Sequence, residues 1–265
     1  MKNFLIVLCM VLVIGGTGYS IYYQVENHNK ENETTNNENT DNKKDNEVGE
    51  NVDINSDIVT TLMNKFAVLN DPFVAGSYSG YLYKKDNYTV NDIDNNVKLM
   101  LATEQIYLKD SSFKSGNFPI IKTKVEMQNE MQNIFGNSVI YADSNITLNC
   151  KGVGLYDENN QTYTFTEPEG CGGTLTPHIE SKAVSATKYS DKLEIVEKMA
   201  YIDYTEGANG LITNVHKNVN DTSIIGTLSD NDDIFTLYGD KLDSYKYSFK
   251  YENGNYYFES IEKIS

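Results

Sequence analysis

The sequence predicts an α+β protein, in which an N-terminal transmembrane helix and a disordered linker precede about three helices and then a curved antiparallel β-sheet. Three observations predict this order. The first residues form one long apolar run, the next stretch is almost wholly polar, and the hydrophobic period changes from helical spacing to two after Val139. These changes divide the 265-residue chain into a membrane anchor at 1–25, a linker at 26–53 and an extracytoplasmic domain at 54–265.

The anchor prediction rests on the uncharged run Phe4–Tyr23, which lies between Lys2 and Glu26. A helix needs roughly 20 apolar residues to cross a bilayer. Because positive charge favours the cytoplasmic side, we expect a single-pass cell-membrane protein with a cytoplasmic N-terminus. The alternative is a cleaved signal peptide with Phe4–Ile14 as its apolar region, which would give a secreted protein. Both interpretations predict export.

The linker at 26–53 consists mainly of Asn, Glu, Asp, Lys and Thr and has no apolar periodicity. Such a segment cannot bury enough surface to offset the entropy lost on ordering, so we expect it to be disordered.

Charge excludes one large class of partner. The chain carries 38 acidic and 22 basic residues, a net charge of −16, and contains no arginine. A phosphate backbone would be repelled by this charge, so we expect no nucleic-acid binding. We also expect no cofactor.

Helical spacing predicts three helices. The first begins after Asn55 or Ser56 and stops at 70–72, and the second covers about Val90–Gln105. The third begins with a capping box at Thr123–Glu126 and ends at Gly136.

Strands are predicted from Val139 onward, and the last hairpin has the strongest signal. Its turn is the type I′ pair Asn253-Gly254. Counting outward from this turn predicts the cross-strand pairs. One face, rich in aromatic rings, has the pairs Tyr251–Tyr256, Phe249–Phe258 and Tyr247–Ser260. The other face, which we expect to be solvated, has the pairs Lys250–Tyr257 and Ser248–Glu259.

Helices followed by a meander across Ile54–Ile264 resemble the element order of the cystatin-like or nuclear-transport-factor-2-like roll. That resemblance implies a curved sheet around a cone-shaped pocket. The anchored, Tyr- and Asn-rich chain is also similar to membrane-anchored hypothetical proteins of low-GC Gram-positive bacteria, which have no assigned activity.

Two cysteines, Cys150 and Cys171, follow the predicted anchor. Outside the cytoplasm this pair favours a disulfide. Free structural thiols are one alternative. The other makes Cys171 a nucleophile with His178 as its base, because a Gly-rich turn exposes backbone amides to an oxyanion.

Metal binding has little support. His178 and His216 lack a second ligand at metal-site spacing, so we expect no metal. The run 230–233 has the acidic character of a calcium loop but lacks its glycine and distal glutamate, and a capped helix start explains it more simply.

The first functional hypothesis is a non-catalytic binding module at the cell envelope, with an envelope protein, a peptide or a glycan as partner. Exposed rings such as Tyr81, Tyr83 and Tyr257 would serve such a surface. The alternatives are a small-molecule enzyme that uses a buried carboxylate in a roll pocket, and a structural envelope component. A deep apolar pocket with one buried acid would favour the enzyme.

Overall fold

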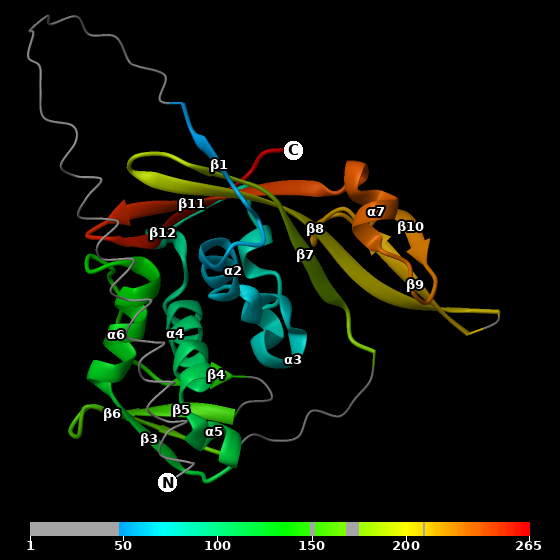
Figure 1. Cartoon of the computed structure of the whole chain (residues 1–265). Helices are drawn as coiled ribbons and strands as arrows, with labels where there is room; N and C mark the ends of the chain where they lie inside the picture. The colour runs from blue at the N-terminus through cyan, green and yellow to red at the C-terminus, as the bar shows by residue number, and fades with distance from the viewer. Residues whose placement is uncertain (1–47, 149–151, 168–174, 209) are drawn as a thin grey trace, which may run out of the picture. The chain divides into compact units, whose positions relative to one another are not determined.

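Two antiparallel sheets with helices between them make up the part of the chain that the computed structural model describes, residues 48–148, 152–167, 175–208 and 210–265 (Figure 1). These residues belong to one unit, Glu47–Ser265. The α+β class and the antiparallel sheets are therefore confirmed.

The predicted anchor at 1–25 lies outside the described residues. Within the described ranges, no helix combines the length and the apolar character needed to cross a bilayer. Most of the predicted linker also lies outside them. Its last residues include strand β1 (Glu50–Val52), which pairs with β7.

Sheet A has the order β1-β7-β8-β11-β12-β2, with β9 beside β8 and β10 beside β9. Its further strands are β2 (Asn87–Thr89), β7 (His178–Lys188), β8 (Lys192–Gly207), β9 (Gly210–His216), β10 (Ile224–Leu228), β11 (Asp243–Glu252) and β12 (Asn255–Lys263). The long strand β8 changes partner along its length. Its first half pairs with β11 and its second half with β9, while β7 stays on its other side.

Sheet B has the order β3-β6-β5-β4 and is a second, separate sheet rather than part of one meander. Its strands are β3 (Ile120–Thr123), β4 (Ile146–Leu148), β5 (Gly152–Asp157) and β6 (Thr162–Phe165). The sequence analysis missed β3. Because β3 pairs with β6, strands β4, β5 and β6 form sheet B with it, and only the strands from β7 onward continue into sheet A.

The helices are α2 (Asp57–Asn64), α3 (Pro72–Ala75), α4 (Asn95–Lys109), α5 (Ser111–Ser115), α6 (Lys124–Phe135) and α7 (Ile234–Tyr238). Helix α6 begins at the predicted capping box, where Thr123 accepts the Glu126 N–H and Glu126 accepts the Thr123 N–H. The second predicted helix starts too early. A capping box between Thr89 and Asp92 closes a separate 3₁₀ turn, and α4 begins only at Asn95.

The first predicted helix is also shorter than expected. The N–H groups of Lys65 and Phe66 bond to carbonyls three residues back, so α2 ends at Asn64 and a 3₁₀ turn follows at Ala67–Asn70. The apolar stripe nevertheless continues, because Phe66 and Leu69 are both buried.

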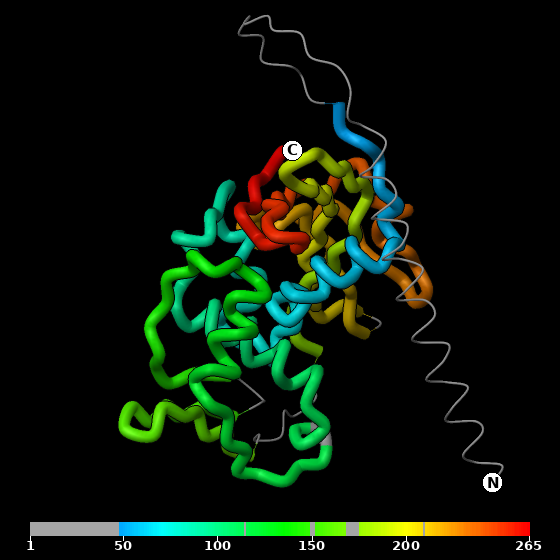
Figure 2. The backbone as a smooth tube through the Cα atoms, turned by 60° about the vertical axis from the view of Figure 1, so that its left-hand side comes forward, coloured from blue at the N-terminus to red at the C-terminus, as the bar shows by residue number. Residues whose placement is uncertain are grey.

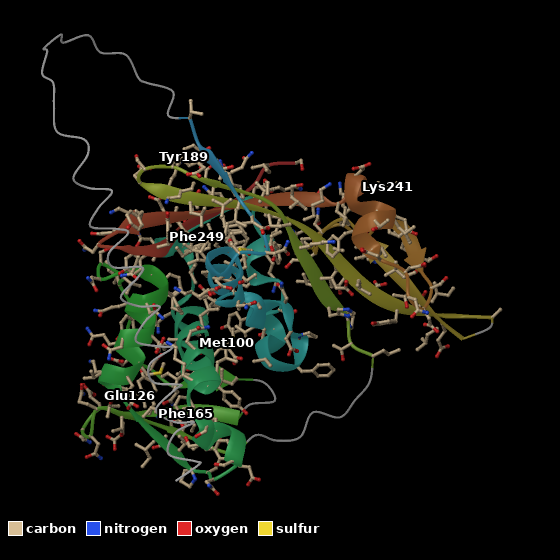
Figure 3. All side chains as sticks on the ribbon, in the orientation of Figure 1. Met100, Glu126, Phe165, Tyr189, Lys241 and Phe249 are labelled. Atoms are coloured by element: carbon tan, nitrogen blue, oxygen red, sulfur yellow. The ribbon has the colours of Figure 1, made fainter. Side chains whose placement is uncertain are left out.

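The helices lie between sheet A and sheet B (Figures 1 and 2). The core is made of buried side chains that come from the helices and from both sheets. Met100 of α4 and Phe249 of β11, labelled in Figure 3, are both fully buried in it. Phe66 joins helix to sheet, since its ring centroid lies 4.9 Å from that of Phe258.

The last hairpin confirms the type I′ turn, because Asn253 and Gly254 both have positive φ. The predicted pairs Tyr251–Tyr256, Phe249–Phe258 and Lys250–Tyr257 are confirmed. Beyond them a bulge shifts the register, so Ser248 faces Ser260 and Tyr247 faces Ile261. The predictions of Tyr247–Ser260 and Ser248–Glu259 were wrong, because Glu259 is the extra residue of the bulge.

Candidate functional site

An open groove of about 680 Å³ lies where the first helical segments face the beginning of β7 and the second half of β8. We call it the His178 groove. It is lined mainly by apolar side chains, with a few polar groups among them, and its residues are Ala67, Asn70, Asp71, Pro72, Phe73, Leu175, Thr176, His178, Ile179 and Tyr204. Ligand sites in proteins typically have this volume and this mixture of lining groups.

One wall of the groove is built by α3. Asp71 caps this helix by accepting the Phe73 N–H at 2.8 Å, and Pro72 stands at its first position. Proline suits that position because its fixed φ is already helical and its missing N–H needs no partner there. The sequence analysis treated Pro72 only as a stop, so it missed the turn of helix that forms this wall.

The opposite wall carries His178 and Tyr204, brought together because β7 and β8 pair at His178–Ile202. The two rings are stacked, with centroids 6.2 Å apart. His178 Nδ1 lies 3.3 Å from the Thr176 carbonyl oxygen and 3.5 Å from the Tyr204 hydroxyl, so the ring has a partner on this side in either tautomer. The Nε2 atom lies 3.7 Å from the Glu180 carboxylate.

The proposed partner of His178 in catalysis, Cys171, lies outside the described residues, and so does Cys150. The Cys150–Cys171 disulfide and the Cys171–His178 nucleophile both stay predictions. What the structure adds is the place of His178, whose ring lines the groove.

A second hollow, of about 180 Å³, adjoins the groove across Ala67 and Asn70, which line both. We call it the Glu197 chamber. Its lining residues are Met63, Asn64, Phe66, Ala67, Asn70, Tyr83, Ser181, Ala183, Glu197 and Tyr247. Glu197 is only 2% exposed.

Hydrogen bonds hold the Glu197 carboxyl group in this chamber. The Tyr83 hydroxyl donates to Glu197 Oε1 at 2.7 Å, and the Tyr247 hydroxyl lies 3.4 Å from that of Tyr83. Burial raises the pKa of Glu197, while hydrogen bonds from Tyr83, Tyr247 and Ser181 oppose this rise. Burial beside Glu197 also raises the pKa of both phenols well above 10, so they stay protonated as donors.

Glu197 reaches the interior through strand periodicity. Leu193, Ile195 and Met199 form the buried face of β8, and Glu197 occupies the same face at its alternate position. The sequence analysis did not single out this acid. An acidic residue in phase with an apolar strand face was the signal that marks this site.

The rings expected on a binding surface lie elsewhere. Tyr81 and Tyr83 are buried, so the expectation that they are exposed was wrong, and Tyr257 is half-buried. They are buried because Tyr81–Tyr83 forms a 3₁₀ turn that packs its rings into the core, with Tyr83 edge-on to Tyr245.

His216 is buried away from the groove, on β9. Its Nδ1 lies 3.2 Å from the Ser223 carbonyl oxygen and its Nε2 lies 3.1 Å from Asp203, off the line of a hydrogen bond. Burial would raise the pKa of Asp203, but the Asn214 amide and the His216 ring lower it by more. This cluster joins β8 to β9.

The acidic run at 230–233 starts a helix. Asp233 accepts the N–H groups of Phe235 and Thr236 and caps α7, as the simpler interpretation predicted. Across the described ranges, no three His, Cys, Asp or Glu side chains gather in a way that would hold a metal ion.

Comparisons with family models, with curated proteins and with solved structures gave no match to this chain. The groove and the chamber are therefore interpreted from their own chemistry. The resemblance in element order to the cystatin-like or nuclear-transport-factor-2-like roll stays an expectation.

Proposed function

We propose that the domain is a non-catalytic binding module that takes a small, largely apolar molecule in the His178 groove. The observation that carries this proposal is the groove itself, about 680 Å³ of mainly apolar surface with a few polar groups. Leu175 at its edge is 61% exposed. A ligand that covers this edge would gain about 25 cal/mol for each Å² of apolar surface removed from water.

The polar groups of the groove suit orientation of a ligand more than chemistry. Asn70 directs its side-chain N–H to Ser181 Oγ at 3.1 Å, and His178 Nδ1 lies 3.3 Å from the Thr176 carbonyl oxygen. These bonds fix the walls of the groove. Tyr204 adds a hydroxyl beside the imidazole, 3.5 Å from its Nδ1.

The enzyme hypothesis required one buried acid in a deep apolar pocket. Here the two features are separate, since Glu197 lines the small chamber and not the groove. This separation supports binding over catalysis.

The proposed location follows from the sequence. Either interpretation of the apolar run Phe4–Tyr23 places the domain outside the cytoplasm, held at the cell membrane in the favoured one. Carbonate washing of membranes tests this, because an anchored chain stays in the pellet. A soluble form that begins near residues 19–21 would instead indicate cleavage.

A titration with 2-naphthol, a neutral aromatic probe, tests the groove. We expect the full chain to bind it in ligand-observed NMR. Leu175→Asp should weaken binding at least about fivefold, because it places a charge on the apolar edge. Leu211→Asp is the matched control, since Leu211 on β9 is similarly exposed, at 57%, and does not line the groove. No binding, or equal weakening by both variants, would refute the proposal.

A further inference from the structure

We infer that the Glu197 chamber is a second binding site, which takes a small organic ammonium ion. This inference does not depend on the function proposed for the His178 groove. It rests on three observations: a buried carboxyl group, aromatic rings around it, and a hollow that reaches the surface.

The carboxyl group supplies the charge. Glu197 is buried and lines the chamber, and it is the one carboxylic acid among the chamber's lining residues. An ionised carboxylate without a cation is costly in such a place. A cation that enters the chamber removes this cost by pairing with it, whereas an anion would raise it.

The rings supply the second element of cation recognition. Phe66, Tyr83 and Tyr247 line the chamber together with Glu197, and the Phe66 and Tyr247 centroids are 5.8 Å apart. The negative faces of aromatic rings attract ammonium groups, and rings of this kind form the cages that bind alkylated amines. A carboxylate beside three rings therefore suits an ammonium group with an apolar body.

The chamber is accessible and its size limits the ligand. The chamber is only partly enclosed, and two of its lining residues, Asn64 and Ala67, are exposed. A cavity of about 150 Å³ holds one benzene molecule. The chamber, at about 180 Å³, therefore has room for an amine of about four to six carbon atoms.

Existing hydrogen bonds prepare the carboxylate for a cation. Burial raises the pKa of Glu197, and the hydrogen bonds from Tyr83, Tyr247 and Ser181 offset part of that rise in favour of the charged form. These groups give Glu197 donors but no positive charge. Among the described residues, none of the lysines lines the chamber, which leaves Glu197 open to a cation from outside.

The test uses n-butylammonium chloride, with 1-butanol as the neutral probe of similar size, titrated into the full chain by ligand-observed NMR. We expect butylammonium to bind at least tenfold more tightly than butanol. Glu197→Gln, which removes the charge and keeps the shape, should abolish that preference. Glu194→Gln is the matched control, because Glu194 lies on the same strand and pairs with Lys192 outside the chamber. It should change the affinity less than twofold.

A second variant covers the case in which Glu197→Gln does not fold. Ala183→Leu fills the chamber while retaining the carboxylate, and it should also abolish butylammonium binding. Leu175→Asp should leave that binding unchanged, which separates this site from the groove. Equal binding of butylammonium and butanol, or equal effects of the Glu197 and Glu194 variants, would overturn the inference and leave Glu197 as a structural acid.

Discussion

Replacing Lys65 by methionine should stabilise the domain at neutral pH and lose that advantage in alkaline solution. Lys65 is 7% exposed, and its ammonium group donates to the Asn133 carbonyl at 2.7 Å, in the last turn of α6. Burial, together with the charge of Lys109, lowers the pKa of Lys65 from 10.5 to about 8, although Glu130 acts in the opposite direction. Methionine keeps the apolar length of the side chain without the charge.

The magnitude follows from the two pKa values. Between about 8 and 10.5 the unfolded chain binds more protons at this site than the folded one, so the stability of the wild type rises with pH across this window. At about 1.4 kcal/mol per pH unit, the charged lysine costs roughly 3 kcal/mol below pH 8. Loss of its hydrogen bond in the variant costs about 1 kcal/mol. The variant should therefore be more stable by roughly 2 kcal/mol at pH 7.

Urea denaturation of both proteins at pH 7 and pH 10 measures the difference. It should fall from roughly 2 kcal/mol to near zero, because the wild-type lysine is mostly neutral at pH 10. Lys84→Met is the control, since Lys84 is exposed and also donates to a backbone carbonyl, that of Ser77. It should follow the wild type within about 0.5 kcal/mol at both pH values. A Lys65→Met protein that is less stable than the wild type at pH 7 would refute the reasoning.

Two further predictions concern the last hairpin and the cysteines. Gly254→Ala should lower the free energy of unfolding by about 1 kcal/mol in urea denaturation, because Gly254 has φ +86° in the type I′ turn, and an unchanged midpoint would contradict this. Thiol labelling of the full chain should find Cys150 and Cys171 unreactive until a reductant is added. Prompt labelling of Cys171 alone would instead favour a reactive thiol beside His178.

The parts of the fold that depend on local chemistry followed from the sequence. The capping box at Thr123–Glu126 satisfies its own backbone groups, and Asn253-Gly254 has the residues that a type I′ turn requires. Both were predicted because their stabilising contacts lie within a few residues.

The sequence patterns did not predict how segments that are distant in the chain pair and pack with one another. The pairing of β3 with β6, which separates sheet B from sheet A, depends on a contact between strands about forty residues apart. The bulge at Glu259 likewise changes a register that counting from the turn sets only for the first pairs.

The candidate sites also depend on contacts between segments that are distant in the chain. His178 was a candidate from the sequence, but its groove exists only because α3 faces the β7–β8 pair. Glu197 lay in phase with an apolar strand face, yet its chamber requires Tyr83, which is 114 residues away along the chain. Local patterns determined the faces of strands and the ends of helices. Tertiary packing alone determined which faces meet. The side chains that line a hollow come from segments far apart in the chain, and interactions between neighbouring residues do not bring such segments together.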